Sequence, residues 1–258
     1  MAVAGAGPRK RRGGAPAVEI AHGATVAELG EAVWNWSSPA GQARLRRRIA
    51  LFANALGLAA GPKRVLELGC GTGLYTEQMA PRCAELVATD IAEVLLAQAR
   101  TRVPARHVRF VAQNLEAVRA ADLGPPFDGV YGCSVLHHLD LDVTLPQLRP
   151  LLAPGAALAF SEPNLWNPQV RLMFSRWQWA RRRWATSDTE MAFYAGELER
   201  SFEDHGFEVV ALFPFDFMHP AIPAGAVAAA ERLERFVERV PVMRYLAGSY
   251  FVHARVPR

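Results

Sequence analysis

VLELGCGTG, residues 65–73, is a short apolar run that breaks into glycines at every second position and then into a helical pattern from Leu74. This pattern is typical of a buried strand, a tight turn and the start of a helix. Glycines at 69, 71 and 73 leave the turn without side-chain bulk, so a nucleotide-like ligand can lie against bare backbone at the positive end of the helix. We therefore expect the turn to be a ligand-docking surface.

Glu67 and the glycine spacing narrow the class of ligand. A carboxylate at the strand end would repel a pyrophosphate but suits a ligand with positive charge, and Glu-x-Gly-x-Gly-x-Gly departs from the dinucleotide fingerprint Gly-x-Gly-x-x-Gly. On these residues the chain resembles the class I S-adenosylmethionine (SAM)-dependent methyltransferases, whose first motif reads as residues 65–73 do. The resemblance implies SAM as the cofactor, held by Glu67, Gly69, Cys70, Gly71, Thr72 and Gly73. An ordinary tight turn or a nicotinamide site is the alternative for a glycine-rich loop considered alone.

Composition indicates one folded domain preceded by a basic arm. A chain of 258 residues with 51% hydrophobic content can bury a substantial core. The net charge is +4, and four positive charges lie in Arg9, Lys10, Arg11 and Arg12. The rest of the chain therefore carries no net charge. We expect residues 1–17 to be a disordered arm and 18–258 a single domain. A solubilising role for the arm is favoured over contact with nucleic acid.

Neither a membrane span nor a metal site is expected. No stretch approaches the run of about 20 apolar residues that crosses a bilayer, and the arm lacks the apolar segment of a secretory signal, so we expect a cytoplasmic protein. Cys70, Cys83 and Cys133 are odd in number and widely spaced, which predicts reduced thiols, and no zinc-ligand spacing is present.

Strand and helix patterns alternate through the core, residues 62–162. A helical segment over 25–57 comes first; its residues 25–34 are weakly helical, and a second helix is capped by Ser38 with Pro39 in its first turn. Arg44, Arg46, Arg47 and Arg48 on that helix are interpreted as a solvated face. The expected strands are 64–68, 85–89, 108–112, 127–132, 156–161, 207–213 and 249–255. The expected helices are 73–80, 92–102, 115–121, 142–152, 195–205 and 224–239.

Such alternation predicts an α/β fold, a doubly wound, mostly parallel sheet with helices on both faces. The resemblance adds an antiparallel pair formed by the last two strands, within residues 194–258. Parallel strands bring their carboxyl ends to one edge, so Gly69, Asp90, Asn114, Cys133 and Glu162 should converge there.

The resemblance assigns further cofactor contacts at this edge. Asp90 would accept hydrogen bonds from the ribose hydroxyls, and its alternative role is a helix cap. Asn114 stands where the family usually has an Asp that accepts from the adenine amino group, and an amide oxygen can still do so. Leu115 and Ile91 would sandwich the adenine ring; plain core packing is the equal alternative.

Cys133 and Ser134, at the end of the fourth strand, lie where the family faces the methyl group. Gly132-Cys133-Ser134 is not the Pro-Pro-aromatic run of the nucleic-acid amine methyltransferases, which counts against nucleic acid as a partner. Cys133 follows no proline and has no partner thiol, so we interpret it as a core residue and not as a nucleophile.

Three residues are candidates for catalysis. An imidazole can take the proton from an acceptor, and His138 is preferred over His137; adjacent side chains point about 100° apart, so we expect only one to serve the pocket. The alternative is a structural, hydrogen-bonding histidine without a catalytic role. Glu162 and Asn164 follow the fifth strand and could orient an amine or hydroxyl. Alternatively they satisfy backbone groups where the chain turns.

All six tryptophans fall outside the strands, and four of them lie in residues 163–193. We expect this segment and the N-terminal segment to cap the sheet edge and wall a pocket with large apolar rings. Together these features predict methyl transfer to an oxygen or nitrogen of a small, partly apolar acceptor. The alternatives are a lipid-linked or quinone-like acceptor at a membrane surface and a SAM-binding protein without catalysis. The oligomeric state stays open.

Overall fold

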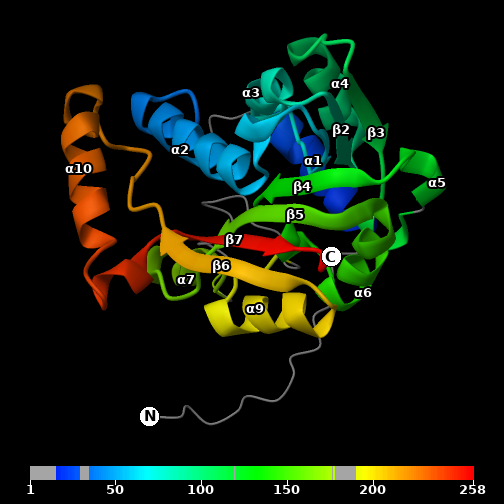
Figure 1. The fold of residues 1–258 in the computed structure, drawn as a ribbon. Helices are drawn as coiled ribbons and strands as arrows, with labels where there is room; N and C mark the ends of the chain where they lie inside the picture. Colours follow the sequence, from blue (N-terminus) through cyan, green and yellow to red (C-terminus); the bar gives the residue numbers. More distant parts are fainter. Residues whose placement is uncertain (1–15, 30–34, 119, 176, 178–189) are drawn as a thin grey trace.

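A seven-stranded sheet is the centre of the structure, a computed structural model that describes residues 16–29, 35–118, 120–175, 177 and 190–258 (Figure 1). The strand order is β3-β2-β1-β4-β5-β7-β6. The five strands β1 to β5 all run parallel, whereas β7 is antiparallel to both β5 and β6. The strand bounds are β1 Arg64–Leu68, β2 Glu85–Asp90, β3 Val108–Ala112, β4 Phe127–Cys133, β5 Leu152–Pro163, β6 Glu208–Phe215 and β7 Ser249–Arg255.

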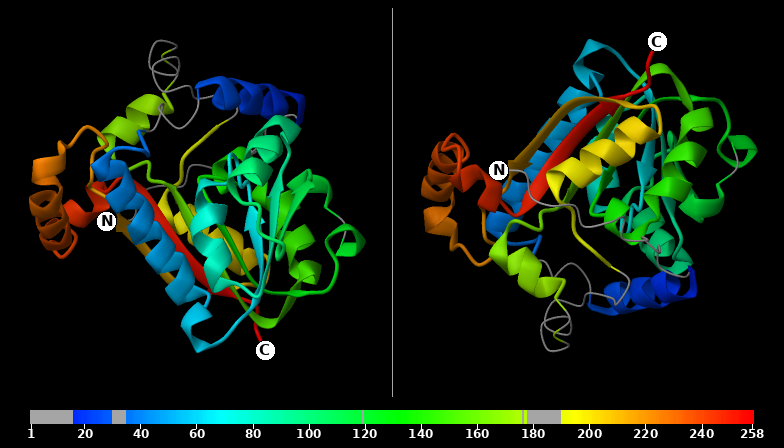
Figure 2. Two further views of the ribbon diagram at one scale, coloured as in Figure 1. Left: turned by 90° about the horizontal axis from the view of Figure 1, so that it is seen from above. Right: turned by 90° about the horizontal axis from the view of Figure 1, so that it is seen from below.

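Helices cover both faces of the sheet. Helices α2, α3 and α4 lie on one face, and α5, α6 and α9 lie on the other, while α10 lies beside α2 (Figure 1). Their bounds are α2 Pro39–Ala55, α3 Leu74–Met79, α4 Glu93–Arg102, α5 Ala120–Leu123, α6 Leu141–Leu148, α9 Ala195–Asp204 and α10 Val227–Val237. Two further helices, α1 Pro16–Leu29 and α7 Pro168–Met173, lie at one end of the molecule (Figure 2).

The core is divided by the sheet into two apolar layers, because successive strand residues point to opposite faces. In β4, Val130 packs in the layer beneath α6 and α9, whereas Tyr131 packs with Phe52 in the layer beneath α2. Both layers are built from fully buried side chains on central strands. This explains why those strands were recognisable as continuous apolar runs.

The predicted α/β fold with its terminal antiparallel pair is confirmed. Strands expected at 64–68, 108–112 and 249–255 agree residue for residue with β1, β3 and β7. The Ser38 cap is also confirmed, since its side chain accepts a hydrogen bond from the Gly41 amide with Pro39 in the first turn. The helix expected over 115–121 is instead a single 3-10 turn, Leu115–Ala117, followed by α5.

The N-terminal end differs from the expectation in two ways. Helix α1 begins at Pro16, two residues inside the expected arm, and ends at Leu29, so it includes residues 25–29 of the expected weak helix; residues 1–15 and 30–34 lie outside the described part. Of the four arginines of α2 that were expected to form a solvated face, only Arg46 is exposed. Arg48 is 3% exposed, and Arg44 and Arg47 are paired with acidic residues of the C-terminal region.

Candidate active site

A cavity of about 1080 Å³ lies at the carboxyl edge of the parallel strands. Its floor is made by the loops that follow β1 to β4, and its walls include residues of α1, α2 and α7. Helices α1 and α7 lie at the same end of the molecule (Figure 2). The predicted convergence of strand ends is therefore observed for Gly69, Asp90, Asn114 and Cys133, all of which line the cavity.

The glycine loop fits a ligand that approaches bare backbone. Gly71 has φ +54°, and a Cβ built there would meet nothing within 4 Å, so this position opens into the cavity. Gly73 has φ +82° and lies outside the cavity wall; a Cβ there would lie 3.0 Å from the Cβ of Ala99 in α4. One glycine thus leaves room for a ligand, while the other permits close helix packing.

Asp90 ends β2 and is held against the loop. Its two carboxylate oxygens accept hydrogen bonds from the amides of Gly71 and Ala92, each at 2.9 Å. Burial raises the pKa of Asp90, although these amides act to lower it. A carboxylate has about four lone-pair positions, so hydroxyl donors can still bind. Asp90 therefore has the capping role considered for it in the sequence, and its place in the cavity wall is compatible with the predicted contact with a ribose.

Ile91, Asn114 and Leu115 also line the cavity, next to Asp90. The Asn114 side-chain oxygen accepts from the Glu116 amide at 3.0 Å and so caps the following turn, which leaves its second lone pair for a ligand. Leu115 is buried in the core as well. Core packing, one of the two alternatives given for Leu115, is therefore observed, and the contact with adenine stays a prediction.

Cys70, Thr72, Cys133 and Ser134 complete the expected cofactor contacts in the cavity wall. The three cysteines form no disulfides. Burial raises the pKa of Cys133, which keeps the thiol protonated and agrees with its interpretation as a packing residue and not a nucleophile. Ser134 has a left-handed backbone with φ +54°, a strained conformation that is common at functional sites.

Glu67 does not line the cavity, contrary to its expected role as a direct partner of the cofactor. Its side chain is 2% exposed and turns behind the loop, where it accepts a hydrogen bond from the Thr76 hydroxyl at 2.6 Å. Burial raises the pKa of Glu67 to about 7. Glu67 therefore ties the end of β1 to α3 and supports the loop from beneath.

Glu67 should make the apo protein less stable as the pH rises. Because its folded pKa is above the unfolded value of 4.5, stability is full below about pH 4.5 and falls as the pH rises to about 7. Glu67→Gln should flatten this part of the curve of melting temperature against pH. Glu77→Gln, on the exposed side of α3, is the matched control and should leave the curve unchanged. An unaltered curve for Glu67→Gln would contradict the assignment.

His137 is held by Glu162 at the floor of the cavity. The Nδ1 atom of His137 lies 2.9 Å from the Glu162 carboxylate, whose other oxygen accepts from the amides of Val135 and Leu136. Glu162 is 1% exposed and does not reach the cavity, so its expected contact with an acceptor is not what the structure shows. A neutral His137 with its proton on Nδ1 can donate to this carboxylate, which leaves Nε2, 3.8 Å from a carboxylate oxygen of Glu190, as the acceptor.

Both histidines line the same cavity, which contradicts the expectation that only one could. They lie on a 3-10 turn, Leu136–His138, and their ring centroids are 4.2 Å apart. His138 Nδ1 lies 2.9 Å from the Glu19 carboxylate of α1. Burial acts to lower the pKa of His138, but Glu19 and Glu190 outweigh it and raise the value, so His138 holds a proton more readily than a free imidazole.

Glu190 joins this group from the chain that returns to the core. One ligand atom each from His137, His138 and Glu190 lies within 4.8 Å of the others, an arrangement that could hold a divalent ion. The sequence spacing gave no sign of such a group, because Glu190 lies 52 residues after His138.

Asn164, by contrast, is wholly structural. Its amide nitrogen donates to the carbonyls of Tyr245 and Ala247, and its oxygen accepts from the Trp166 amide. The alternative given for Asn164, that it satisfies backbone groups at the turn, is the one observed.

Both segments expected to cap the sheet edge do line the cavity, but mostly through residues other than tryptophan. Trp166 and Trp177 are 55% and 60% exposed and do not line the cavity. Trp34, Trp179 and Trp184 lie outside the described residues. Met173, Phe174 and Trp36 supply the apolar wall. No helix among the described residues is long and apolar enough to cross a bilayer.

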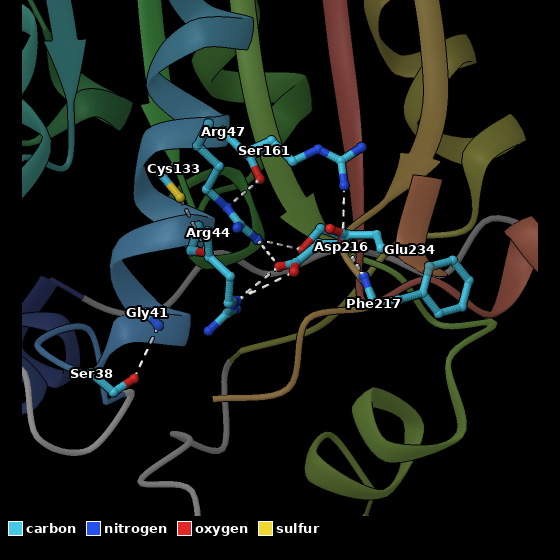
Figure 3. Close-up of polar contacts among 12 residues, drawn as sticks. Ser38, Gly41, Arg44, Arg47, Cys133, Ser161, Asp216, Phe217 and Glu234 are labelled. Carbon is cyan, nitrogen blue, oxygen red and sulfur yellow. Dashed lines mark hydrogen bonds and ion pairs between the residues drawn. The ribbon is translucent and has the colours of Figure 1, made fainter. Parts of the chain in front are cut away.

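The cavity wall also contains an arginine group that was not predicted from the sequence, Arg44 and Arg48 of α2 with Asp216 after β6. Figure 3 shows Arg44 and Asp216 facing each other, with Cys133 and Ser161 close by. One feature of the sequence could have identified Arg48 as a buried residue. Leu45, Arg48 and Phe52 are spaced three and four residues apart, so Arg48 lies on the apolar face of its helix.

Comparison with known proteins agrees with this geometry. A model of the methyltransferase domain family matches residues 41–212. The trans-aconitate 2-methyltransferase of Methylobacterium nodulans is 39% identical over 121 residues, which cover 44% of each protein. The chain spans less than half the length of the first curated relatives it matches.

Solved structures share the fold at low identity. The N-methyltransferase NodS of Bradyrhizobium japonicum, in complex with S-adenosylhomocysteine (SAH), has a TM-score of 0.57 at 18% identity, covering 86% of this chain and 89% of NodS. The [4+2]-cyclase SpnF has a TM-score of 0.56 at 21% identity, covering 82% and 80%. On the family match and the architecture of the glycine loop, the chain belongs to the methyltransferase domain family, as a class I member with SAM as its cofactor.

Proposed function

We propose that the protein transfers a methyl group from SAM to an oxygen or nitrogen of a small, partly apolar acceptor. The observation that carries this proposal is the single cavity into which both the Gly71 backbone and the ring of His137 open. Among relatives, one named for trans-aconitate and a structural neighbour named as an N-methyltransferase fit an oxygen or nitrogen acceptor.

The chain's own residues provide alignment and proton removal. Gly69, Gly71, Asp90, Asn114 and Leu115 would hold SAM, which supplies an activated methyl group when bound. Alignment of donor and acceptor in a closed cavity can lower a barrier by about 7–11 kcal/mol in ideal cases. His137 Nε2 takes the proton from the acceptor, and Glu162 stabilises the imidazolium that results. We therefore assign the base to His137 in preference to His138.

Calorimetric titration with SAM, SAH and NAD tests the proposal first. We expect SAM and SAH to bind and NAD not to bind. Asp90→Ala should weaken SAH binding by about tenfold to a hundredfold, since hydrogen bonds to a charged group contribute about 1.5–3 kcal/mol each. Asp142→Ala, at an exposed carboxylate in α6, is the control and should bind SAH normally. Binding of NAD in place of SAM would overturn the assignment of the cofactor.

An acceptor screen then tests transfer itself, beginning with trans-aconitate, phenols and primary amines. Formation of SAH together with a methylated product supports the proposal. Tight SAM binding without turnover on any acceptor would favour a SAM-binding protein without methyl transfer. The exposed rings of Trp166 and Trp177 favour a second candidate, a lipid-linked or quinone-like acceptor, which sedimentation of the protein with liposomes would support.

A further inference from the structure

The arginine group, Arg44 and Arg48 with Asp216, lies in the cavity wall and is not used by the mechanism above. Its members come from α2 and from the segment after β6, which are more than 160 residues apart in the chain. Trp36 stacks beside both guanidinium groups, at 4.7 Å from Arg44 and 5.6 Å from Arg48. Such rigid stacking holds planar cations in a defined orientation.

Hydrogen-bond donors exceed acceptors in this group. Arg48 bonds Asp216 and Ser249 through Nη2 and Ser161 through Nε, but its buried Nη1 has no partner among the described residues. Arg44 bonds Asp216 through Nε alone, and no hydrogen bond involves its Nη atoms within the described part of the chain. A guanidinium presents five N–H donors, so the buried Nη1 of Arg48 lacks an acceptor, and the Nη donors of the partly exposed Arg44 remain available to a ligand.

Within the arginine group, the two guanidinium groups outnumber the one carboxylate. Burial acts to raise the pKa of Asp216, but Arg48 and Arg44 lower it below its ordinary value, so Asp216 is ionised. Asp216 balances only one of the two arginines. Arg47, one residue before Arg48, lies outside the wall and pairs with Glu234 and Glu238. The three arginines and the three carboxylates together carry no net charge. An anion would therefore be attracted at short range through hydrogen bonds and not through a long-range field.

Backbone strain marks the same place. Asp216 has φ +76°, a left-handed conformation that is rare for residues other than glycine. It is fixed there by its own amide, which donates to Glu238, and by its carbonyl, which accepts from the Gly248 amide. Strain of this kind persists where the surrounding structure needs the side chain in one position. The position needed here is the one that aligns both arginines.

We propose that Arg44 and Arg48 form a binding site for a carboxylate of the methyl acceptor, so that the acceptors of this enzyme are small organic acids. The inference rests on the proposed function and names its substrate class. A carboxylate is planar and can accept two parallel hydrogen bonds from guanidinium donors. The acid group would be anchored at α2, and Trp36 would cover the apolar part of the acceptor.

A matched pair of probes tests this site. 4-Hydroxybenzoate and 4-hydroxybenzamide, together with acetate and acetamide, are titrated into the protein saturated with SAH. We expect each acid to bind at least about tenfold more tightly than its amide, because charge-assisted hydrogen bonds are roughly twice as strong as neutral ones. Arg44→Gln should abolish this preference, and Arg44→Lys should keep part of it. SAH affinity should be unchanged in both variants.

Arg46→Gln is the control, because it makes the same charge change on an exposed position of α2. Equal binding of acid and amide, an equal loss in Arg44→Gln and Arg46→Gln, or no carboxylate binding at the highest soluble concentration would each overturn the proposal. Stronger competition by inorganic phosphate than by acetate would overturn the carboxylate assignment in favour of a phosphorylated acceptor. Titration of the same probes without SAH separates the two proposals. If SAH does not bind, the cofactor assignment is contradicted, but the affinities of acid and amide can still be compared.

Discussion

Gly71→Arg should abolish SAM and SAH binding while the protein remains folded. Gly71 opens into the cavity, and a Cβ there meets no atom within 4 Å, so the new side chain extends into the space that the cofactor needs. It also carries a charge of the same sign as the sulfonium of SAM. We expect the affinity for SAH to fall by more than about a hundredfold, or about 2.8 kcal/mol.

A change at Gly206 separates this effect from backbone strain. Gly206 has φ +78° and an open Cβ position, as Gly71 has, but it follows α9 and is outside the cavity wall. Both arginine substitutions should cost about 1–2 kcal/mol of stability from the left-handed backbone. Only the variant at position 71 should lose SAH in calorimetry. Normal SAH binding by a folded Gly71→Arg protein would refute the placement of the cofactor.

The sheet was predictable because its signals are local. Each parallel strand is a short apolar run bounded by turn residues, and the glycines of residues 69–73 fix the loop that follows β1. The residues at or just after the carboxyl ends of β1 to β4 were correctly expected at the edge, since parallel topology alone brings them together. Asp90, Asn114 and Cys133 are examples.

The rest of the cavity depends on contacts between distant segments. Nothing near Arg48 in the sequence reveals Asp216 as its partner, so an arginine-rich helix looked solvated. Likewise, Glu67 and Glu162 lie near the carboxyl ends of their strands, at the correct edge of the sheet. Their side chains nevertheless turn away from the cavity and accept hydrogen bonds from buried hydroxyl and amide groups. A strand end fixes where a residue lies, but tertiary hydrogen bonds decide where its side chain points.

The pair of histidines shows the same limit. The rule that adjacent residues point about 100° apart applies to α-helices. Residues 136–138 form a 3-10 turn, and flexible torsions bring the rings of His137 and His138 together. Their partners, Glu162 and Glu19, come from β5 and α1. The sequence therefore named both candidate bases, but its preference for His138 could not take these distant partners into account.

His137→Ala should reduce turnover by about a hundredfold to ten-thousandfold, the usual contribution of general base catalysis, while SAH affinity stays within about twofold of the parent protein. His138→Ala is the matched comparison and should have a smaller effect, because the Glu19 carboxylate holds its pKa up. Initial rates with an acceptor from the screen provide the measurement. Chelation of divalent ions with EDTA should leave the parent rate unchanged if the imidazole acts as a base and not as a metal ligand.

Glu162→Gln is the sharper test of how the base is prepared. A glutamine can keep the shape of the site, with its oxygen still accepting from the amides of Val135 and Leu136. Its NH2 group then faces His137 Nδ1, which must become the acceptor, so the ring proton moves to Nε2 and the base is lost. We expect turnover to fall nearly as far as in His137→Ala, with no further loss in the double variant, because both changes remove one function. Full activity in Glu162→Gln with a normal melting temperature would show that the acceptor loses its proton without His137, and that alignment alone accounts for the rate.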